Sequence, residues 1–354
     1  MQTAVSLHSH TSRSREMMDF IPRYIESVPF LSPAIRNLEY RYHRYHGHPF
    51  DYSRVWWTPP LEPKAAFLLE REQIEAKLDR QALISISDHD NVDAGYALEL
   101  IEECRGAAIS SEWSLPISGG LLHIGVHNMQ SARAHMLHEA MAWVTENPTG
   151  SKIDEMLDEL QSDPATLIVI NHPLWDETRI GRDAHRAILR RFLERHGRHI
   201  HALELNGLRP EPENSEVIRL GAEYRLPVIS GGDRHGVEPN AILNLTSART
   251  FSEFAAGIRN GEPTHIVYMP QYEEPMNLRI THLISDVLHT YDEFSQDRRR
   301  WSDRIYYRCE DGEVRRLSDV WTGNGPGVIG YFVSLFQLLR HRQVRTLLRY
   351  AFSS

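Results

Sequence analysis

The chain has 354 residues, 41% of them hydrophobic, which is enough for one large core with an appendage. Its net charge of −9 gives no overall basic surface for nucleic acid, and Cys104 and Cys309 are too few and too far apart for a disulfide scaffold or a cysteine-based zinc site. The N-terminal residues do not resemble a signal peptide, and no apolar run has the length of a membrane span, so we expect a cytoplasmic protein.

Short apolar runs alternate with helical patterns along most of the chain. We expect strands at 3–8, 82–87, 107–111, 121–126, 166–170, 200–205, 227–231 and 264–268. We expect helices at 67–80, 93–104, 152–162, 183–196, 214–224 and 251–260, the last with capping-box spacing between Thr250 and Glu253 and with Asn260-Gly261 at its end. Strands that alternate with helices favour parallel pairing, and seven or eight such repeats predict an α/β fold with a closed or nearly closed barrel.

Residues 30–65 are too long for a single crossover between two strands. They are rich in aromatic residues: Tyr40, Tyr42, Tyr45, Tyr52, Trp56 and Trp57. This insertion is either a lid over the C-terminal end of the first strand or a packed excursion that only stabilises the barrel. Its three histidines, His43, His46 and His48, could reach a site, but a solvated loop is favoured.

The tail from about residue 276 is less regular and is expected to form a mainly helical appendage. Within 328–352 one helical face carries Val328, Phe332, Leu335, Phe336 and Leu339, followed by Arg340, Arg342, Arg345 and Arg349. A basic amphipathic helix can lie on a membrane or bind a partner, although a terminal helix docked on the body is favoured.

Polar side chains follow many of the predicted strands. Residues i and i+2 of a strand point to the same side, so His8 and His10 should converge, as should Asp233 and His235. The strand ends supply His8, His10, Asp88, His89, Glu112, His123, His127, His172, Glu204, Asn206, Asp233 and His235. A lone strand histidine is more often structural than a ligand, but this joint pattern at the C-terminal end of a barrel predicts a metal centre. One zinc ion with three protein ligands would not use them all, so we expect two or three ions bridged by a carboxylate such as Glu112 or Asp233.

Six short motifs resemble those of one family. They are His8-Ser9-His10-Thr11, Ser87-Asp88-His89-Asp90, Glu112 after the third strand, His123-Ile124-Gly125, Asn171-His172-Pro173 and Gly232-Asp233-Arg234-His235. In this order, from residue 3 to about 268, the chain resembles the polymerase and histidinol phosphatase (PHP) family of metal-dependent phosphoesterases. The resemblance implies a distorted (β/α)7 TIM-like barrel over residues 1–275, with the appendage at 276–354. It also implies up to three zinc, manganese or iron ions, held by His8, His10, His89, Glu112, His123, His172, Asp233 and His235.

The chain departs from the family pattern after the first motif. The family commonly has an aspartate five positions past the second histidine or a histidine six positions past it, where this chain has Arg15 and Glu16. Glu16 is able to bind a metal and Arg15 is not. The second metal site, to which His89 and His172 should contribute, is therefore expected to be altered or weak.

Clustered divalent ions lower the pKa of bound water and clamp phosphoryl oxygens, which predicts hydrolysis of a phosphate ester of a small molecule or nucleotide by a metal-activated hydroxide. We expect His10, Asp233 and His235 to be catalytic, and either His235 or His123 to assist the leaving group. Arginines near the strand ends could grip the phosphate through their planar forked donors. Those expected to bind substrate are Arg15, Arg209 and Arg234, with Arg13 as a further candidate.

Other functions are compatible with the same ligands. A nuclease or polymerase-associated module is disfavoured by the negative charge, and a basic groove leading to the metals would restore it. A metal-binding scaffold without turnover is suggested only by Arg15. An amidohydrolase barrel also opens with His-x-His, but the Asp88-His89 pair and the closing Asp-x-His favour the phosphoesterase. The natural substrate, the choice between monoester and diester, and the oligomeric state are left open.

Overall fold

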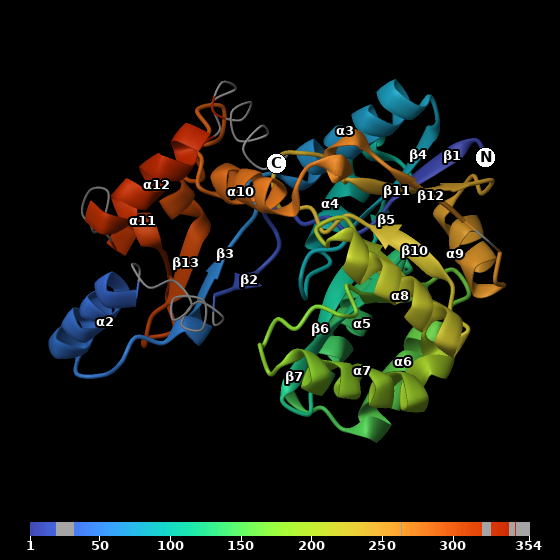
Figure 1. Cartoon of the computed structure of the whole chain (residues 1–354), viewed down its shortest axis with the longest axis horizontal. Coiled ribbons are helices and arrows are strands. Elements are labelled where there is room, and N and C mark those ends of the chain that lie inside the picture. Colours follow the sequence, from blue (N-terminus) through green and yellow to red (C-terminus); the bar gives the residue numbers. More distant parts are fainter. Residues whose placement is uncertain (19–31, 263, 321–326, 340–343, 345–354) are drawn as a thin grey trace.

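The computed structural model describes residues 1–18, 32–262, 264–320, 327–339 and 344, and it is a mixed α/β protein with three sheets (Figure 1). The first sheet has the strand order β12-β11-β1-β4-β5. Its strands are β1 (Thr3–Ser6), β4 (Gln81–Ile86), β5 (Ala108–Ile109), β11 (Ile242–Thr246) and β12 (His265–Tyr268). The second sheet has the order β10-β9-β8-β7-β6. Its strands are β6 (Ser111–Ile117), β7 (Gly120–His127), β8 (Leu167–Asn171), β9 (Ala202–Asn206) and β10 (Val228–Gly231).

The first two sheets meet in two places, at β5 and β6 and at the ends of β1 and β10. On one side only Ser110 separates β5 from β6, and its hydroxyl accepts a hydrogen bond from Ser85 at 2.7 Å. On the other side the N–H of Gly232 donates to the carbonyl of Leu7 at 2.9 Å. The sheets therefore enclose a common interior, although the ladders of the described residues do not form one continuous closed barrel.

The prediction of parallel pairing is wrong for several strands. Strand β7 runs antiparallel to both β6 and β8, and β11 runs antiparallel to β1 and β12. The chain turns from β6 to β7 through Ser118 and Gly119, whose φ angles of 51° and 83° are both in the left-handed region. A two-residue turn of this kind joins antiparallel strands, whereas a parallel connection needs about a dozen residues.

Helices cover the outside of these sheets. They are α3 (Pro63–Gln73), continued by a π-helical turn at Ile74–Leu78, α4 (Asp93–Glu99), α5 (Ser131–Glu146), α6 (Gly150–Gln161), α7 (Arg182–His196), α8 (Glu211–Tyr224) and α9 (Phe251–Arg259). The expected N-cap of α9 is present, because the Thr250 hydroxyl accepts the N–H of Glu253 at 3.2 Å. Helix α5 was missing from the expected helices, since Met136 and Trp143 lie on its exposed side and blur its apolar pattern. Short 3-10 helices lie at Tyr52–Arg54, Glu102–Cys104, Gly197–His199, Pro270–Glu273 and Trp301–Arg304.

The inserted segment and the tail are joined in the third sheet, which has the order β14-β13-β3-β2. It pairs β2 (Glu16–Met17) and β3 (Val55–Trp57) with β13 (Ile305–Arg308) and β14 (Val314–Arg316). Together with α2 (Ser32–His46), α11 (Leu317–Val320) and α12 (Gly327–Leu339) we call this unit the cap, which lies on the left in Figure 1. Helix α10 (Met276–Val287) lies between the cap and the body.

The predicted tail helix corresponds to α12, which packs on α10. The Ser285 hydroxyl of α10 donates to the carbonyl of Phe336 at 2.8 Å, which favours the docked helix of the two interpretations. Arg340, Arg342, Arg345 and Arg349, and the side chains of Val328 and Leu339, lie outside the described residues. Among the helices that the structure describes, none is long and apolar enough to cross a membrane.

Candidate metal centre

The predicted metal ligands converge on one place from seven strands. His8 and His10 follow β1, His89 follows β4, His172 follows β8, and Asp233 and His235 follow β10. Glu16, Glu112 and His123 lie within β2, β6 and β7. Their donor atoms form four overlapping groups, with all atoms of a group within 4.8 Å of one another. The groups are His10-Glu16-His89-His235, His8-His10-Asp233, His8-Glu112-His172 and His89-Glu112-His123.

Glu112 lies at the centre of the cluster and is completely buried. Its Oε2 is 3.0 Å from Nε2 of His8 and 3.3 Å from Nε2 of both His10 and His89. Its Oε1 is 3.2 Å from Nε2 of His172 and 3.4 Å from Nδ1 of His123. The two oxygens of this carboxylate therefore face different imidazoles, an arrangement compatible with the bridging role expected for Glu112.

Glu16 completes the group on the cap side. Its Oε2 lies 3.2 Å from Nε2 of His89 and 3.3 Å from Nε2 of His235, and its Oε1 accepts a hydrogen bond from Ser14 at 2.6 Å. A carboxylate is therefore present where the sequence left the second metal site in doubt. His89 and His172 do not share a group as expected, because His172 faces His8 and Glu112 instead.

Hydrogen bonds orient the histidine rings toward the centre. Nδ1 of His8 lies 2.6 Å from Oε1 of Glu204, and Oε2 of Glu204 accepts the backbone N–H of His172 at 2.7 Å and an N–H of the Asn206 amide at 3.0 Å. Nδ1 of His235 donates to the carbonyl of Asp233 at 2.9 Å. These contacts leave the Nε2 atoms of His8 and His235 facing the cluster, which is how proteins fix imidazole ligands.

Two other polar residues near the strand ends have structural positions. Asp88 accepts hydrogen bonds from the N–H and the hydroxyl of Thr11 at 2.5 and 2.7 Å, and burial raises its pKa to about 7. It therefore closes the loop that carries His10. His127 contacts the Ser85 hydroxyl through Nδ1 at 2.8 Å, and burial lowers its pKa to about 3.

Three of the ligand residues have unusual backbone conformations. The φ angles of His8, His172 and Asp233 are 62°, 26° and 54°, in the left-handed region that residues other than glycine seldom adopt. Each costs about 1–3 kcal/mol, and such conformations cluster at functional sites. The fold therefore stabilises these three strained backbone conformations, which direct the side chains of His8, His172 and Asp233 into the ligand cluster.

The buried charges of the cluster favour a cation. Burial alone would lower the pKa of His8, but Glu112, Glu204 and Asp233 together raise it well above its usual value. Burial, helped by His235, lowers the pKa of His10 to about 3, so this ring is neutral at pH 7. Its Nε2 is buried without a hydrogen-bond partner among the described residues. A neutral imidazole nitrogen beside carboxylates suits zinc, manganese or iron, so the residues present fit such ions.

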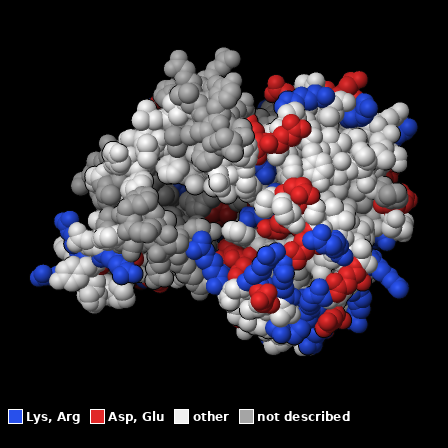
Figure 2. Space-filling view, viewed as in Figure 1, with Lys and Arg blue, Asp and Glu red and all other residues white. Residues whose placement is uncertain are grey.

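A cavity of about 570 Å³ opens over the cluster. Its floor includes Glu16, His89, His123, His172, Asp233 and His235. Its walls include Arg15, then Met17 and Trp57 of the cap, Trp175, Glu177 and Thr178 from the loop after β8, Leu208 and Arg209 from the loop after β9, and Leu283 of α10. Figure 2 shows the surface hollowed between the cap and the body, with acidic side chains visible there.

The insertion contributes directly to this cavity. The Trp57 ring lies 5.7 Å from the His235 ring, which supports the interpretation of the insertion as a lid. His43, His46 and His48 are not among the residues that line the cavity, and His48 pairs with Glu310 at 2.8 Å.

The arginines expected to bind substrate have different environments. Arg15 is exposed, with its guanidinium carbon 5.9 Å from the ring centroid of Trp56, and Arg209 is half-buried over Trp175 at 3.7 Å. Both line the cavity, whereas Arg13 does not.

The expectation for Arg234 is corrected by its surroundings. Its side chain is buried, and it donates to Glu70 at 3.0 Å and to the carbonyls of Gly236 and His10 at 2.9 and 3.2 Å. Its donors are therefore occupied by the protein itself, so Arg234 holds the loop that carries Asp233 and cannot offer a free fork to a phosphate.

Glu177 is a residue of the site that sequence reasoning missed. Its Oε2 lies 3.6 Å from Nε2 of His123, and burial raises the pKa of its carboxyl group. It follows the His172-Pro173 motif in a loop without regular structure, so no spacing rule pointed to it.

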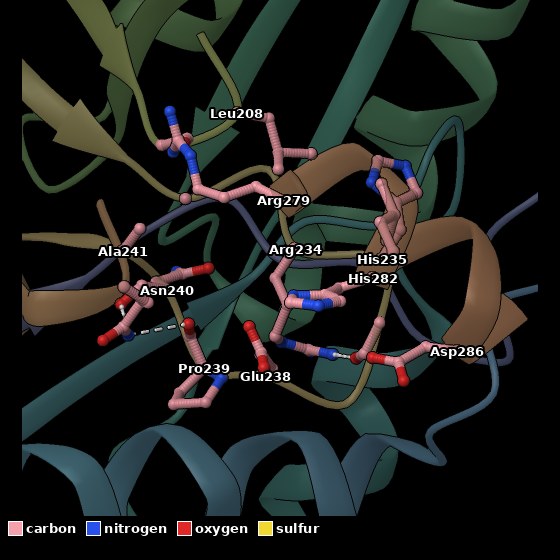
Figure 3. Close-up of a pocket in the computed structure, with 15 residues that line it drawn as sticks. Leu208, Arg234, His235, Glu238, Pro239, Asn240, Ala241, Arg279, His282 and Asp286 are labelled. Carbon is pink, nitrogen blue, oxygen red and sulfur yellow. Dashed lines mark hydrogen bonds between the residues drawn. The ribbon is translucent and has the colours of Figure 1, made fainter. Parts of the chain in front are cut away.

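Helix α10 forms hydrogen bonds to two loops of the site, the loop after β9 and the loop after β10, and lines a second cavity of about 60 Å³ (Figure 3). The guanidinium of Arg279 donates to the carbonyl of Gly207 and, at 3.5 Å, to that of Arg209. Asp286 accepts the N–H of Val237 at 3.1 Å. The tail is thereby linked both to the loop of Arg209 and to the loop of Asp233 and His235.

No protein-family model and no curated protein matches the chain. Among solved structures, PsfC from Pseudomonas syringae PB-5123 is 16% identical with a TM-score of 0.45, over 80% of this chain and 98% of that one. A protein from Bifidobacterium adolescentis ATCC 15703, described as a metal-dependent phosphoesterase, is 13% identical with a TM-score of 0.31, over 51% and 85% of the two chains. An amidohydrolase from Chromobacterium violaceum, with bound sulfate and no metal, is 14% identical with a TM-score of 0.36, over 59% and 93%. At these identities and TM-scores the likenesses do not establish a function for this chain, and a functional proposal has to be based on the site itself.

Proposed function

We propose that this protein is a metal-dependent phosphoesterase of the PHP type, with a distorted (β/α)7 barrel, that hydrolyses a phosphate ester of a small molecule or nucleotide. The observation that carries the proposal is the position of Glu112 among five imidazoles, with Glu16 and Asp233 in the flanking ligand groups. The ordered motifs of the sequence support the same assignment.

Two or three zinc, manganese or iron ions would be held by the groups described above. His8, His10 and Asp233 would hold one ion, and Glu16, His89 and His235 with His10 a second. Glu112 would hold a further ion, either with His8 and His172 or with His89 and His123. When bound, such ions supply hydroxide near neutral pH and neutralise the charge on a phosphoryl group.

The chain itself orients these ligands and shapes the space above them. Glu204 holds the His8 ring in place, and Trp57 and Trp175 line the cavity. Arg15 and Arg209 have forked donors at the cavity wall and would contact the substrate. His10, Asp233 and His235 would act through the ions they hold.

Metal analysis and turnover test this proposal together. The purified protein should contain zinc, manganese or iron by elemental analysis, and with added manganese it should hydrolyse an aryl phosphate or a bis-aryl phosphodiester. His10→Ala and Asp233→Ala should abolish turnover, whereas His135→Ala, at an exposed position of α5, should retain it. Full activity in both site variants would contradict the proposed site, and bound metal without turnover would indicate a scaffold.

A further inference from the structure

Arg209 is held at the cavity wall by contacts that leave its guanidinium group open. The guanidinium carbon lies 3.7 Å from the ring centroid of Trp175. Its backbone carbonyl accepts hydrogen bonds from the hydroxyl of Tyr272 at 3.2 Å and from Arg279 at 3.5 Å. Its backbone N–H donates to the carbonyl of Asn206 at 3.2 Å. Both the backbone and the plane of the guanidinium are therefore positioned before any ligand binds.

No guanidinium N–H of Arg209 donates to a residue in the described part of the chain, and its Nε is buried. The Nε of Arg279 is also buried without a partner, but the terminal nitrogens of Arg279 donate to two carbonyls and Arg234 donates to Glu70, so these two guanidinium groups are occupied by the protein. A desolvated donor without an acceptor costs about 1–3 kcal/mol. Together with its place in the cavity wall, this open fork indicates that the acceptor belongs to the ligand, and a planar fork matches the two oxygens of a carboxylate or phosphate.

The loop of Arg209 is connected to the metal centre through Asn206. The Asn206 amide donates to Oε2 of Glu204 at 3.0 Å and to Oδ2 of Asp233 at 3.3 Å, and its Oδ1 accepts the N–H of Leu208 at 2.7 Å. Arg209 is therefore anchored beside the ligands without contacting any of them.

The metal centre leaves little need for a further cation at the reacting phosphate. With all three ions bound, six positive charges would face the three ligand carboxylates Glu16, Glu112 and Asp233, and the surplus by itself would neutralise a dianionic phosphoryl group. The cavity of about 570 Å³ is also much larger than a phosphoryl group and has apolar walls at Trp57 and Leu208. The organic part of the substrate would fill this space, within the reach of Arg209.

We propose that Arg209 binds a second anionic group, a carboxylate or a phosphate, on the organic part of the substrate. This inference rests on the proposed function, because it takes the reacting phosphate to lie on the metals. It makes Arg209 a specificity-determining residue that selects esters with a second anionic group over esters whose only anionic group is the reacting phosphate.

Binding of non-hydrolysable analogues tests the inference without requiring turnover. The manganese-loaded protein would be titrated calorimetrically with benzylphosphonate, 4-carboxybenzylphosphonate and 1,4-xylylenebisphosphonate. The wild type should bind at least one doubly anionic analogue tenfold or more tightly than benzylphosphonate, and the tighter of the two identifies the second group. Arg209→Met should reduce this preference to within about threefold, and Arg209→Lys should restore only part of it, because a lysine lacks the fork. Arg219→Met, at an exposed position of α8, is the matched control and should keep the wild-type preference.

The outcomes separate this inference from the proposed function. An equal loss of affinity for all three analogues in Arg209→Met would place Arg209 at the reacting phosphate and overturn the inference. A wild-type protein without the preference, or one that binds none of the analogues, would overturn it too. Absence of phosphate ester hydrolysis with an intact, Arg209-dependent preference would contradict the proposed function alone.

Discussion

Replacement of Glu204 by glutamine should weaken metal binding, although Glu204 itself is no ligand. Its two carboxylate oxygens act as acceptors toward Nδ1 of His8 at 2.6 Å, the N–H of His172 at 2.7 Å and the amide of Asn206 at 3.0 Å. A glutamine has one acceptor oxygen and one NH2 group. If the amide turns its NH2 toward His172, that group meets a backbone donor and the His172 contact is lost. If it turns the NH2 toward His8, the ring can accept at Nδ1 only with its proton on Nε2, and that nitrogen can then no longer bind a metal.

The expected loss can be estimated from this geometry. Removal of a hydrogen-bonding partner behind a ligand histidine lowers metal affinity about 10- to 100-fold, or roughly 1.4–2.7 kcal/mol. The buried donor left without an acceptor puts a cost of about 1–3 kcal/mol on the glutamine variant, which is of the same size. The affinity of the Glu204→Gln protein for zinc and manganese would be measured by competition with a chromophoric chelator. Glu194→Gln, at an exposed position of α7, is the control. Wild-type affinity in Glu204→Gln would refute the orienting role.

Three further predictions concern the stability and shape of the site. Arg234→Met should lower the free energy of unfolding, measured by urea denaturation, by about 3–5 kcal/mol, because it leaves Glu70 as a buried charge. Adding Glu70→Gln to this variant should recover part of the loss. An unchanged denaturation midpoint in Arg234→Met would contradict the buried ion pair. In the metal-free protein, His8 has a pKa raised above its unfolded value of about 6.5, so the stability it contributes is present below that value and is lost as pH rises through the folded pKa. Tm should therefore fall as pH rises, while metal affinity increases. A Tm that increases with pH in the presence of EDTA would contradict this sign. Trp57→Ala should raise KM for an aryl phosphate several-fold with a smaller effect on kcat and unchanged metal content, and an unaltered KM would show that the insertion does not contact substrate.

The convergence of the ligands could be predicted from the sequence because it depends on short-range rules. Spacing by two residues correctly pairs His8 with His10 and Asp233 with His235, although both pairs follow their strands and His8 and Asp233 have left-handed φ angles. The C-terminal ends of neighbouring strands also meet, as expected for this fold class. The same spacing could have indicated that Arg234, between two inward residues, points to the other side. Its partner Glu70 lies 164 residues away and could not be identified from spacing.

Other features depend on tertiary contacts that no local pattern carries. The Ser118-Gly119 turn was a readable hairpin signal, and it would have shown that β6 and β7 are antiparallel. The pairing of β3 with β13 joins residues about 250 positions apart, and short strands of this kind are specified by their surroundings rather than by propensity. Glu177 entered the site through an irregular loop, where its distance from His123 follows only from the folded chain.

The union of β3 with β13 has a consequence for the order of folding. A chain growing on the ribosome exposes Trp56 and Trp57 long before their hydrogen-bonding partner at Ile305–Arg308 has been synthesised. During that interval the strand has an open, aromatic edge able to pair with other chains. We therefore expect proteins truncated before residue 305 to aggregate even if their ligand residues are intact, and chaperone dependence to end when the last strands emerge.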